Sequence, residues 1–253
     1  MQKRELDRKK IVNILGEGSE SIVYAYKEGE VYVALKEFKK EFVTPTKKEP
    51  ISKEVFKNKE RKLLLLNQSD FLEDDEKPID LYYENGEFVA YSMKIDLSKN
   101  FEYHYTSSKK IKLELLNLLR DRKEILNKNG IYIGDFNAEN FGIREDGTIK
   151  LKDIDNFSIQ GLPFDRPTNL VKEYMKKCNN IKNIDNYSFN YFSLGFFMAV
   201  EPRVLDKTLK EKGLPKKFDT EENRQLLEDL ENINDDYEPR YFIDSQKKGL
   251  FIR

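Results

Sequence analysis

The sequence predicts an α+β protein, with a small antiparallel sheet and one helix first and a mostly helical part after them. Two observations predict this class. Within the first 95 of the 253 residues, short runs of β-branched and aromatic residues alternate with glycine-containing turns. From residue 96 on, longer segments carry apolar residues at helical spacing. The length suffices for one domain with two closely packed lobes, and we expect these lobes to span 1–95 and 96–253.

Five strands and one helix are expected in the first lobe. The glycine-containing segments 16–18 and 28–30 separate the first three strands, and Asn85-Gly86 is a typical two-residue hairpin turn. A charged segment ending in four leucines predicts the helix. We expect strands at 11–15, 21–26, 31–38, 79–83 and 88–93, and the helix at 52–66.

Helices dominate the predicted second lobe. Apolar residues near helical spacing predict a helix at 109–128, which Asn129-Gly130 ends. Two short strands, 131–133 and 149–151, flank a loop. The segment 185–200 is apolar nearly all round, which is typical of a helix buried on several sides. A last amphipathic helix is expected at 220–233.

The composition argues against several classes of protein. The 45 Lys and Arg residues almost balance the 46 Asp and Glu residues, which leaves a net charge of 45 − 46 = −1 and no field that favours nucleic acid or acidic membranes. One Cys and one His exclude an intramolecular disulfide and a multi-histidine zinc site. The start of the chain is charged, and no run of about 18 apolar residues follows. We therefore expect a cytoplasmic protein that binds neither nucleic acid nor membrane.

A glycine-rich turn and a strand lysine are the first residues that suggest chemistry. Gly16 and Gly18 lie between two predicted strands, where their backbone N–H groups could approach phosphate oxygens, although a plain hairpin also explains them. Lys36 ends the apolar strand segment 33–36 that follows. In this order, the two elements resemble the protein-kinase family.

The resemblance implies a bilobal protein-kinase-like fold and a set of ATP contacts. In that family a helix carboxylate pairs with the strand lysine; Glu60 fits this place best, and Glu54 is the alternative. The hinge that meets adenine would lie near 91–95. The implied nucleotide-binding residues are Gly16, Gly18, Ser21, Val23, Ala34, Lys36, Glu60 and Met93.

The segment 130–140 is similar to the family's catalytic loop. Asp135 and Asn140 match its Asp-x-x-x-x-Asn spacing, and Asp153 follows thirteen residues after Asn140, where the family places a metal-binding Asp. The resemblance implies that Asp135, with Lys36, is catalytic. It also implies that Asn140 and Asp153 hold Mg²⁺, with Asp155 as a possible further ligand, because Mg²⁺ prefers oxygen donors.

Asp185 opens a segment similar to the family's central buried helix. The resemblance implies that its carboxylate braces the catalytic loop by accepting backbone N–H bonds. A helix N-cap is the alternative role for this residue.

The sequence also departs from the family. Ser21 replaces a third glycine, Ile133-Gly134 replaces the usual His-Arg, and Asn137 replaces a lysine. The Phe-Gly after the metal-binding Asp and the Ala-Pro-Glu element are absent. Because the missing Arg would dock a phosphorylated loop, we expect activity without loop phosphorylation. These departures also resemble small-molecule kinases of the aminoglycoside and choline type.

The expected function is transfer of the γ-phosphate of ATP, with Mg²⁺, to a hydroxyl group. The expected acceptor is a protein Ser or Thr. The alternatives are a small-molecule kinase and a nucleotide-binding pseudokinase scaffold, because a fold does not decide the substrate.

Overall fold

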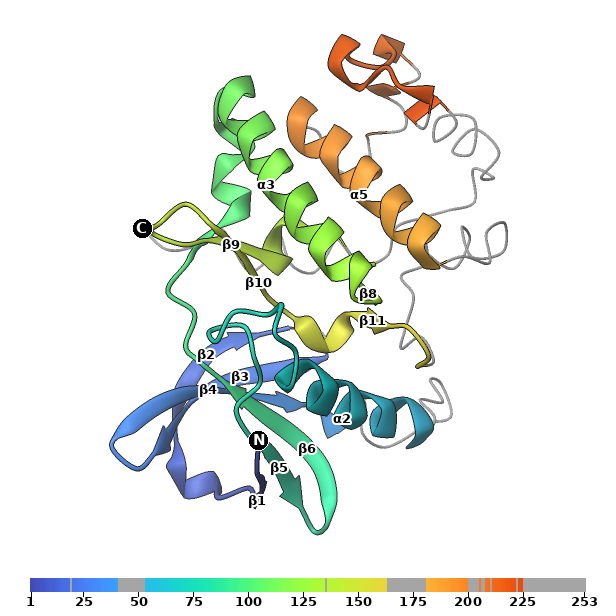
Figure 1. The fold of residues 1–253 in the computed structure, drawn as a ribbon. Helices are drawn as coiled ribbons and strands as arrows, with labels where there is room; N and C mark the ends of the chain where they lie inside the picture. Colours follow the sequence, from blue (N-terminus) through green and yellow to red (C-terminus); the bar gives the residue numbers. More distant parts are fainter. Residues whose placement is uncertain are drawn as a thin grey trace.

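Figure 1 shows the computed structural model of the chain, which describes residues 1–18, 20–40, 53–134, 136–162, 181–199, 205, 208–209, 211–221 and 223–224. The fold class is α+β, as predicted. A six-stranded sheet and helix α2 (Lys53–Asn67) occupy one end of the molecule. Helices α3 (Lys109–Lys128) and α5 (Ile181–Met198) lie side by side at the other end.

The large sheet has the strand order β1-β5-β6-β4-β3-β2. All neighbouring strands pair antiparallel except β1 and β5, which are parallel. The sheet is therefore mixed, and the prediction of a purely antiparallel sheet was wrong. The strands are β1 (Lys3–Glu5), β2 (Ile11–Glu17), β3 (Ser21–Glu28), β4 (Val31–Phe38), β5 (Leu81–Glu84) and β6 (Glu87–Met93).

The unpredicted strand β1 is held by polar contacts at its own edge of the sheet. The Asp80 carboxylate accepts hydrogen bonds from the backbone N–H of Gln2 at 2.7 Å and from Nε of Arg4 at 2.6 Å. Three charged residues, Lys3–Glu5, form the strand. Because strand patterns are recognised by alternating apolar residues, this segment carries no such signal.

The β5–β6 hairpin and helix α2 follow the predictions closely. Asn85 and Gly86 both have positive φ angles, 54° and 78°, as a two-residue primed turn requires. Helix α2 buries Leu63 and Leu66 completely, in one cluster with Phe38 of β4 and Tyr91 of β6. The leucine run therefore fastens the helix to the sheet.

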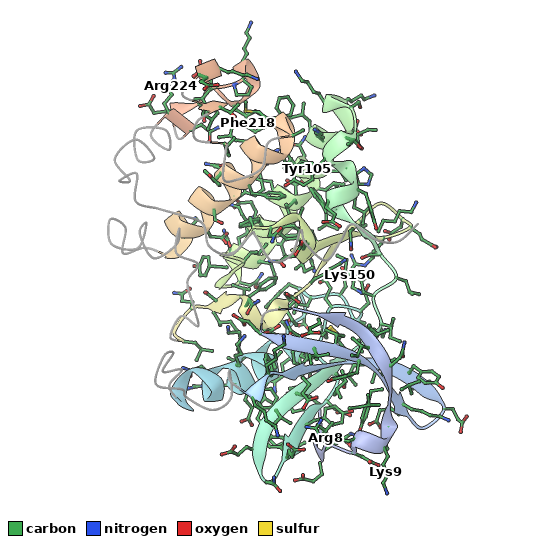
Figure 2. The ribbon with its side chains drawn as sticks, turned by 180° about the vertical axis from the view of Figure 1, so that it is seen from behind. Arg8, Lys9, Tyr105, Lys150, Phe218 and Arg224 are labelled. Atoms are coloured by element: carbon green, nitrogen blue, oxygen red, sulfur yellow. The ribbon has the colours of Figure 1, made fainter. Side chains whose placement is uncertain are left out.

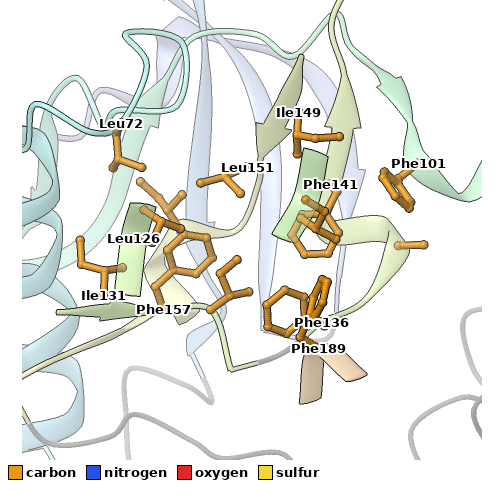
Figure 3. Close-up of a cluster of buried hydrophobic side chains, with 14 of the residues drawn as sticks. Leu72, Phe101, Leu126, Ile131, Phe136, Phe141, Ile149, Leu151, Phe157 and Phe189 are labelled. Carbon is orange, nitrogen blue, oxygen red and sulfur yellow. The ribbon is translucent and has the colours of Figure 1, made fainter. Parts of the chain in front are cut away.

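Aromatic side chains fill the core of the helical part. Phe101 contacts Phe196 of α5 with ring centroids 4.6 Å apart, and Phe136 meets Phe189 edge-on at 5.4 Å. Figure 3 shows Phe136, Phe141 and Phe189 gathered in this cluster. The segment around Phe136 is thus anchored to α5 by packing.

Short elements connect the two ends. Strands β7 (Lys99–Asn100), β9 (Phe141–Ile143) and β10 (Ile149–Leu151) form one small sheet, and β8 (Ile131–Tyr132) with β11 (Ser158–Ile159) forms another. The strands predicted at 131–133 and 149–151 therefore exist but belong to different sheets. The 3-10 helices within the described residues are η1 (Arg8–Lys10), η2 (Phe101–Thr106), η3 (Ala138–Asn140), η4 (Ile154–Asn156) and η5 (Lys216–Phe218); η2 spans two turns and the others one.

A buried carboxylate ties the segment after α2 to the β9–β10 hairpin. Oε1 of Glu76 accepts from the backbone N–H of Leu151 at 2.9 Å and from Arg144 at 3.0 Å, and Arg122 of α3 also contacts this carboxylate. Lys150, which Figure 2 places midway along the molecule, pairs with Asp75 at 3.3 Å. These contacts hold the hairpin against both ends of the fold.

The end of the chain is described only in part. Of the helix predicted at 220–233, only residues 220, 221, 223 and 224 belong to the described residues. Within the described ranges, no helix combines the length and the apolar character that crossing a bilayer requires.

Candidate active site

Lys36 of β4 is the cation at the centre of the site. Its side chain is only 5% exposed, and its Nζ donates to Asp155 Oδ1 at 2.7 Å and to Asp153 Oδ1 at 3.1 Å. Burial disfavours the charged form of Lys36, but the carboxylate of Asp155 outweighs it, so the pKa of Lys36 lies well above its usual range. The structure thus brings together two predicted residues, Lys36 and Asp153, which are 117 positions apart.

Asp155 is the buried counter-ion of this cluster. Its side chain is 1% exposed; Oδ1 accepts from Lys36 and from the Tyr91 hydroxyl at 2.8 Å, and Oδ2 accepts from Lys59 at 2.9 Å. Burial raises the pKa of Asp155, but Lys36 and Lys59 reverse this effect and lower it below the usual range. Because N–H and O–H donors occupy both oxygens, Asp155 does not fit the predicted role of a second metal ligand.

Glu60 does not pair with Lys36, and that prediction was wrong. Its Oε1 accepts from Lys3 Nζ and from the Tyr83 hydroxyl, both at 2.6 Å. Successive residues of an α-helix are turned by about 100°, so α2 directs Lys59 into the site and Glu60 toward β1 and β5. The side chain of the alternative, Glu54, lies outside the described part of the chain.

The β9–β10 hairpin brings the backbone before Asp153 next to the backbone of Asn140. Leu151 pairs with Phe141, and the next backbone bond joins Lys152 N–H to the Asn140 carbonyl at 2.9 Å. Asp153, one residue further, has a left-handed backbone (φ 49°) and a side chain that is 48% exposed. Its carboxylate therefore remains accessible beside Lys36, unlike that of Asp155.

The side chains of Asp153 and Asn140 are of the chemical types that suit a Mg²⁺ ion shared with a ligand. Asp153 offers an accessible carboxylate and Asn140 an amide oxygen, the donor types that Mg²⁺ prefers. Among the described residues, no group of three or more His, Cys, Asp or Glu side chains could enclose a metal by itself. A Mg²⁺ ion here would need further oxygen donors, such as phosphate and water.

Asp135 lies outside the described residues, but the backbone on both sides of it is well held. The Gly134 N–H donates to Asp185 Oδ1 at 2.8 Å, and the Phe136 N–H donates to the Ser188 hydroxyl at 3.4 Å. Asp185 Oδ2 accepts from the Asn127 amide at 3.0 Å. The prediction that Asp185 braces this loop is confirmed. The N-cap alternative is wrong, because α5 begins four residues earlier, at Ile181.

The glycine-rich turn lies on the same sheet as Lys36. The ladders pair Gly16 with Val23, Val23 with Lys36, and Lys36 with Tyr91, so these residues form one row across four strands. A Cβ added at Gly16 would meet nothing within 4 Å.

The other predicted nucleotide contacts lie around this row. Gly18 donates its N–H to the Ser21 carbonyl at 2.9 Å and so closes the β2–β3 turn. Ala34 pairs with Met93, two positions before Lys36 on β4. The predicted residues of the sheet thus lie in or beside the row that carries Lys36.

Two lysines of α2 lie at the site although the sequence analysis did not predict them there. Lys59 and Lys62 are almost completely buried; Lys59 meets Asp155 Oδ2, and Lys62 Nζ donates to the backbone oxygen of Asp155 at 2.9 Å. A signal was available, because positions 59, 62, 63 and 66 share one helical face with the buried leucines. A lysine within an apolar stripe indicates a buried anion nearby.

Comparison with known proteins does not assign the chain to a family. The chain matches neither any protein-family model nor any curated protein that was searched.

Proposed function

We propose that this protein is a phosphotransferase that moves the γ-phosphoryl group of Mg-ATP to a hydroxyl group, in a bilobal kinase-like fold. The observation that carries the proposal is the 3.1 Å contact between Lys36 Nζ and Asp153 Oδ1. It joins a strand lysine, aligned with a glycine-rich turn, to an accessible carboxylate beside Asn140. A cation and oxygen donors for a metal at one point suit a metal-bound polyphosphate.

Each residue has a distinct role in this proposal. Lys36 donates hydrogen bonds to the α- and β-phosphate oxygens, and the backbone of Gly16 and Gly18 covers the phosphates. Asp153 and Asn140 hold the Mg²⁺, which when bound neutralises negative charge on the triphosphate. The backbone near Met93 meets adenine.

The transfer step needs one more residue, Asp135. Its carboxylate orients the acceptor hydroxyl and takes its proton. The hydroxyl oxygen forms a bond to the γ-phosphorus while the bond from that phosphorus to the bridging oxygen breaks, and ADP leaves. Bracing by Asp185 on one side of Asp135 and Ser188 on the other supports this role, because general base catalysis requires a fixed geometry.

We propose a protein Ser or Thr side chain as the acceptor. A radiolabelled-ATP assay with generic protein substrates in one arm and a panel of hydroxyl metabolites in the other tests this. We expect Mg²⁺-dependent label in protein, and a loss of at least about a hundredfold in Asp135→Asn and in Asp153→Asn.

The matched control is Arg61→Met, which removes an exposed cation from α2 and should keep the wild-type rate. Label in metabolites alone would replace the protein acceptor by a small molecule. Nucleotide binding without transfer in either arm would favour a scaffold, and transfer undiminished in Asp135→Asn would contradict the mechanism.

A further inference from the structure

We propose that Lys59 of α2 is a positioning residue for Lys36 and acts on it through Asp155. The proposal extends the phosphotransferase function given above and rests on it for its catalytic consequence. The contact between Lys59 and Asp155 exists independently of that function.

The two oxygens of one carboxylate join the two lysines. Asp155 Oδ1 accepts from Lys36 at 2.7 Å, and Oδ2 accepts from Lys59 at 2.9 Å. Rotation of the carboxylate would break both charged hydrogen bonds, and such bonds are strong inside a protein. Lys59 therefore fixes the direction in which Asp155 presents Oδ1 to Lys36.

Lys59 also distributes the charge of Asp155. With two ammonium groups on one carboxylate, Lys36 shares its counter-ion and keeps N–H capacity for a further anion, such as the phosphates of ATP. If Lys59 is removed, Lys36 is the ammonium group that remains on the Asp155 carboxylate among the described residues, while Lys62 stays on the backbone oxygen of Asp155. The carboxylate then draws Lys36 more strongly. Lys36 would then bind phosphate less well, although it is itself unchanged.

The position of Lys59 links three elements to this pair. Its Nζ lies 3.7 Å from Glu20 Oε2, at the β2–β3 turn, and donates to Asn156 Oδ1 of η4 at 3.1 Å. It also lies 5.1 Å from the ring centre of Phe38 on β4. A shift of α2 relative to the sheet would therefore reach both Lys36 and the glycine-rich turn.

The charge that α2 contributes to this contact is opposite to the one that the sequence suggested. We expected α2 to supply a carboxylate that pairs with Lys36. In the structure α2 supplies a cation, and the carboxylate comes from the segment after β10. One buried anion with a cation on each side performs the same coupling of helix to strand lysine.

A mutant cycle tests whether Lys59 acts through Asp155. The variants are Lys59→Met, Asp155→Asn and both together, with Arg61→Met as the exposed control on the same helix. We expect Lys59→Met to lower kcat/KM for ATP at least about tenfold, mainly through KM. Lys59→Arg should stay within about threefold of wild type.

The cycle separates a shared action from independent damage. If Lys59 works through Asp155, the double variant loses no more kcat/KM than Asp155→Asn alone. Fold losses that multiply, or a Lys59→Met enzyme within about twofold of wild type, would overturn the proposal.

A second readout needs no enzymatic activity. In protein labelled with ¹⁵N-lysine, the ammonium resonance of Lys36 should move in Lys59→Met and stay unchanged in Arg61→Met. An unmoved resonance overturns the positioning role. A moved resonance in a protein that neither binds nor uses ATP would keep that role and reject the proposed function.

Lys59→Arg covers the case in which Lys59→Met does not fold. It keeps the charge but changes the geometry at Asp155, so it should keep kcat/KM within about threefold and still shift the Lys36 resonance. Failure of either result would count against the proposal.

Discussion

Lys36 and Asp155 are 119 residues apart in the sequence, yet Lys36 Nζ donates to Asp155 Oδ1 across 2.7 Å. The pair joins β4 of the large sheet to the segment that follows β10. Asp155 is the carboxylate that pairs with Lys36, the role that the sequence suggested for Glu60. The side chain of Asp153, beside the same lysine, remains accessible.

Loss of Asp155 should destabilise the fold strongly. In Asp155→Asn the buried ammonium groups of Lys36 and Lys59 lose their shared carboxylate, and breaking a buried ion pair costs about 3–5 kcal/mol. Chemical unfolding measures this free energy. The control is Asp153→Asn, whose half-exposed side chain should cost about 1 kcal/mol or less. Equal losses in the two variants would contradict the assignment of Asp155 as the buried counter-ion.

Glu60→Gln should have little effect on nucleotide binding. It weakens a contact with Lys3, whose side chain is 60% exposed, so we expect a loss of unfolding free energy below about 1 kcal/mol. The dissociation constant of a non-hydrolysable ATP analogue should stay within about twofold of wild type. A tenfold weaker analogue affinity would restore Glu60 as the partner of Lys36.

Removal of the Asp185 carboxylate should loosen the loop around position 135. Asp185→Ala leaves the Gly134 N–H and the Asn127 amide without their acceptor, which should cost about 2 kcal/mol. Hydrogen exchange at the Gly134 amide should become faster by more than the global loss of stability explains. Unchanged exchange at Gly134 would argue against the bracing role.

Gly142 of β9 is required because Ser98 lies against it. A Cβ at position 142 would stand 1.9 Å from Ser98 Oγ and 2.8 Å from Ser98 Cβ. Gly142→Ala should therefore lose about 2 kcal/mol of unfolding free energy. In a protein that already carries Ser98→Gly, adding Gly142→Ala should cost less unfolding free energy than it does in wild type. A Gly142→Ala protein as stable as wild type would show that the segment around Ser98 moves away without cost.

Asp96 should make stability depend on pH in acid. Burial opposes its ionisation, but hydrogen bonds from Lys152 and Ser98 outweigh burial and lower the pKa of Asp96 to about 2. In the unfolded chain an Asp has a pKa of about 4. A lowered folded pKa stabilises the protein above about pH 4, and this contribution disappears as the pH falls from about 4 to about 2.

The variant Asp96→Asn isolates this contribution. Wild type should exceed it by about 1 kcal/mol above pH 4, after allowance for solvent screening, and the difference should shrink toward pH 2. Urea unfolding at several pH values provides the measurement. A difference that grows as the pH falls would have the wrong sign for this account.

Local patterns predicted much of the fold, but not how its elements face each other. The hairpin at Asn85-Gly86 and the helix at 109–128 follow from turn chemistry and from apolar spacing, which act over a few residues. Strand β1 is held by Asp80, about 76 residues away, so its own sequence carries no signal. The rotation of α2, which turns Lys59 inward and Glu60 outward, depends on packing against the sheet.

In the candidate site, too, part of the arrangement was predicted from the sequence and part depends on contacts between distant residues. The resemblance assigned Lys36 and Asp153 to one ATP site, and in the structure their side chains lie 3.1 Å apart. The sequence analysis did not predict that Asp155 is buried. An Asp two residues from another Asp is as typical of a metal site as of a buried counter-ion. Only the contacts with Lys59 and Tyr91, from distant parts of the chain, distinguish a counter-ion from a ligand.

Calorimetric titration of a non-hydrolysable ATP analogue, with and without Mg²⁺, tests the central claim most directly. We predict Mg²⁺-dependent binding to wild type, at least about tenfold weaker binding in Lys36→Met, which corresponds to about 1.4 kcal/mol, and loss of the Mg²⁺ dependence in Asp153→Asn. Analogue affinity that is the same with and without Mg²⁺, and unaffected by either variant, would contradict the claim that Lys36 and Asp153 form a site for a metal-bound triphosphate.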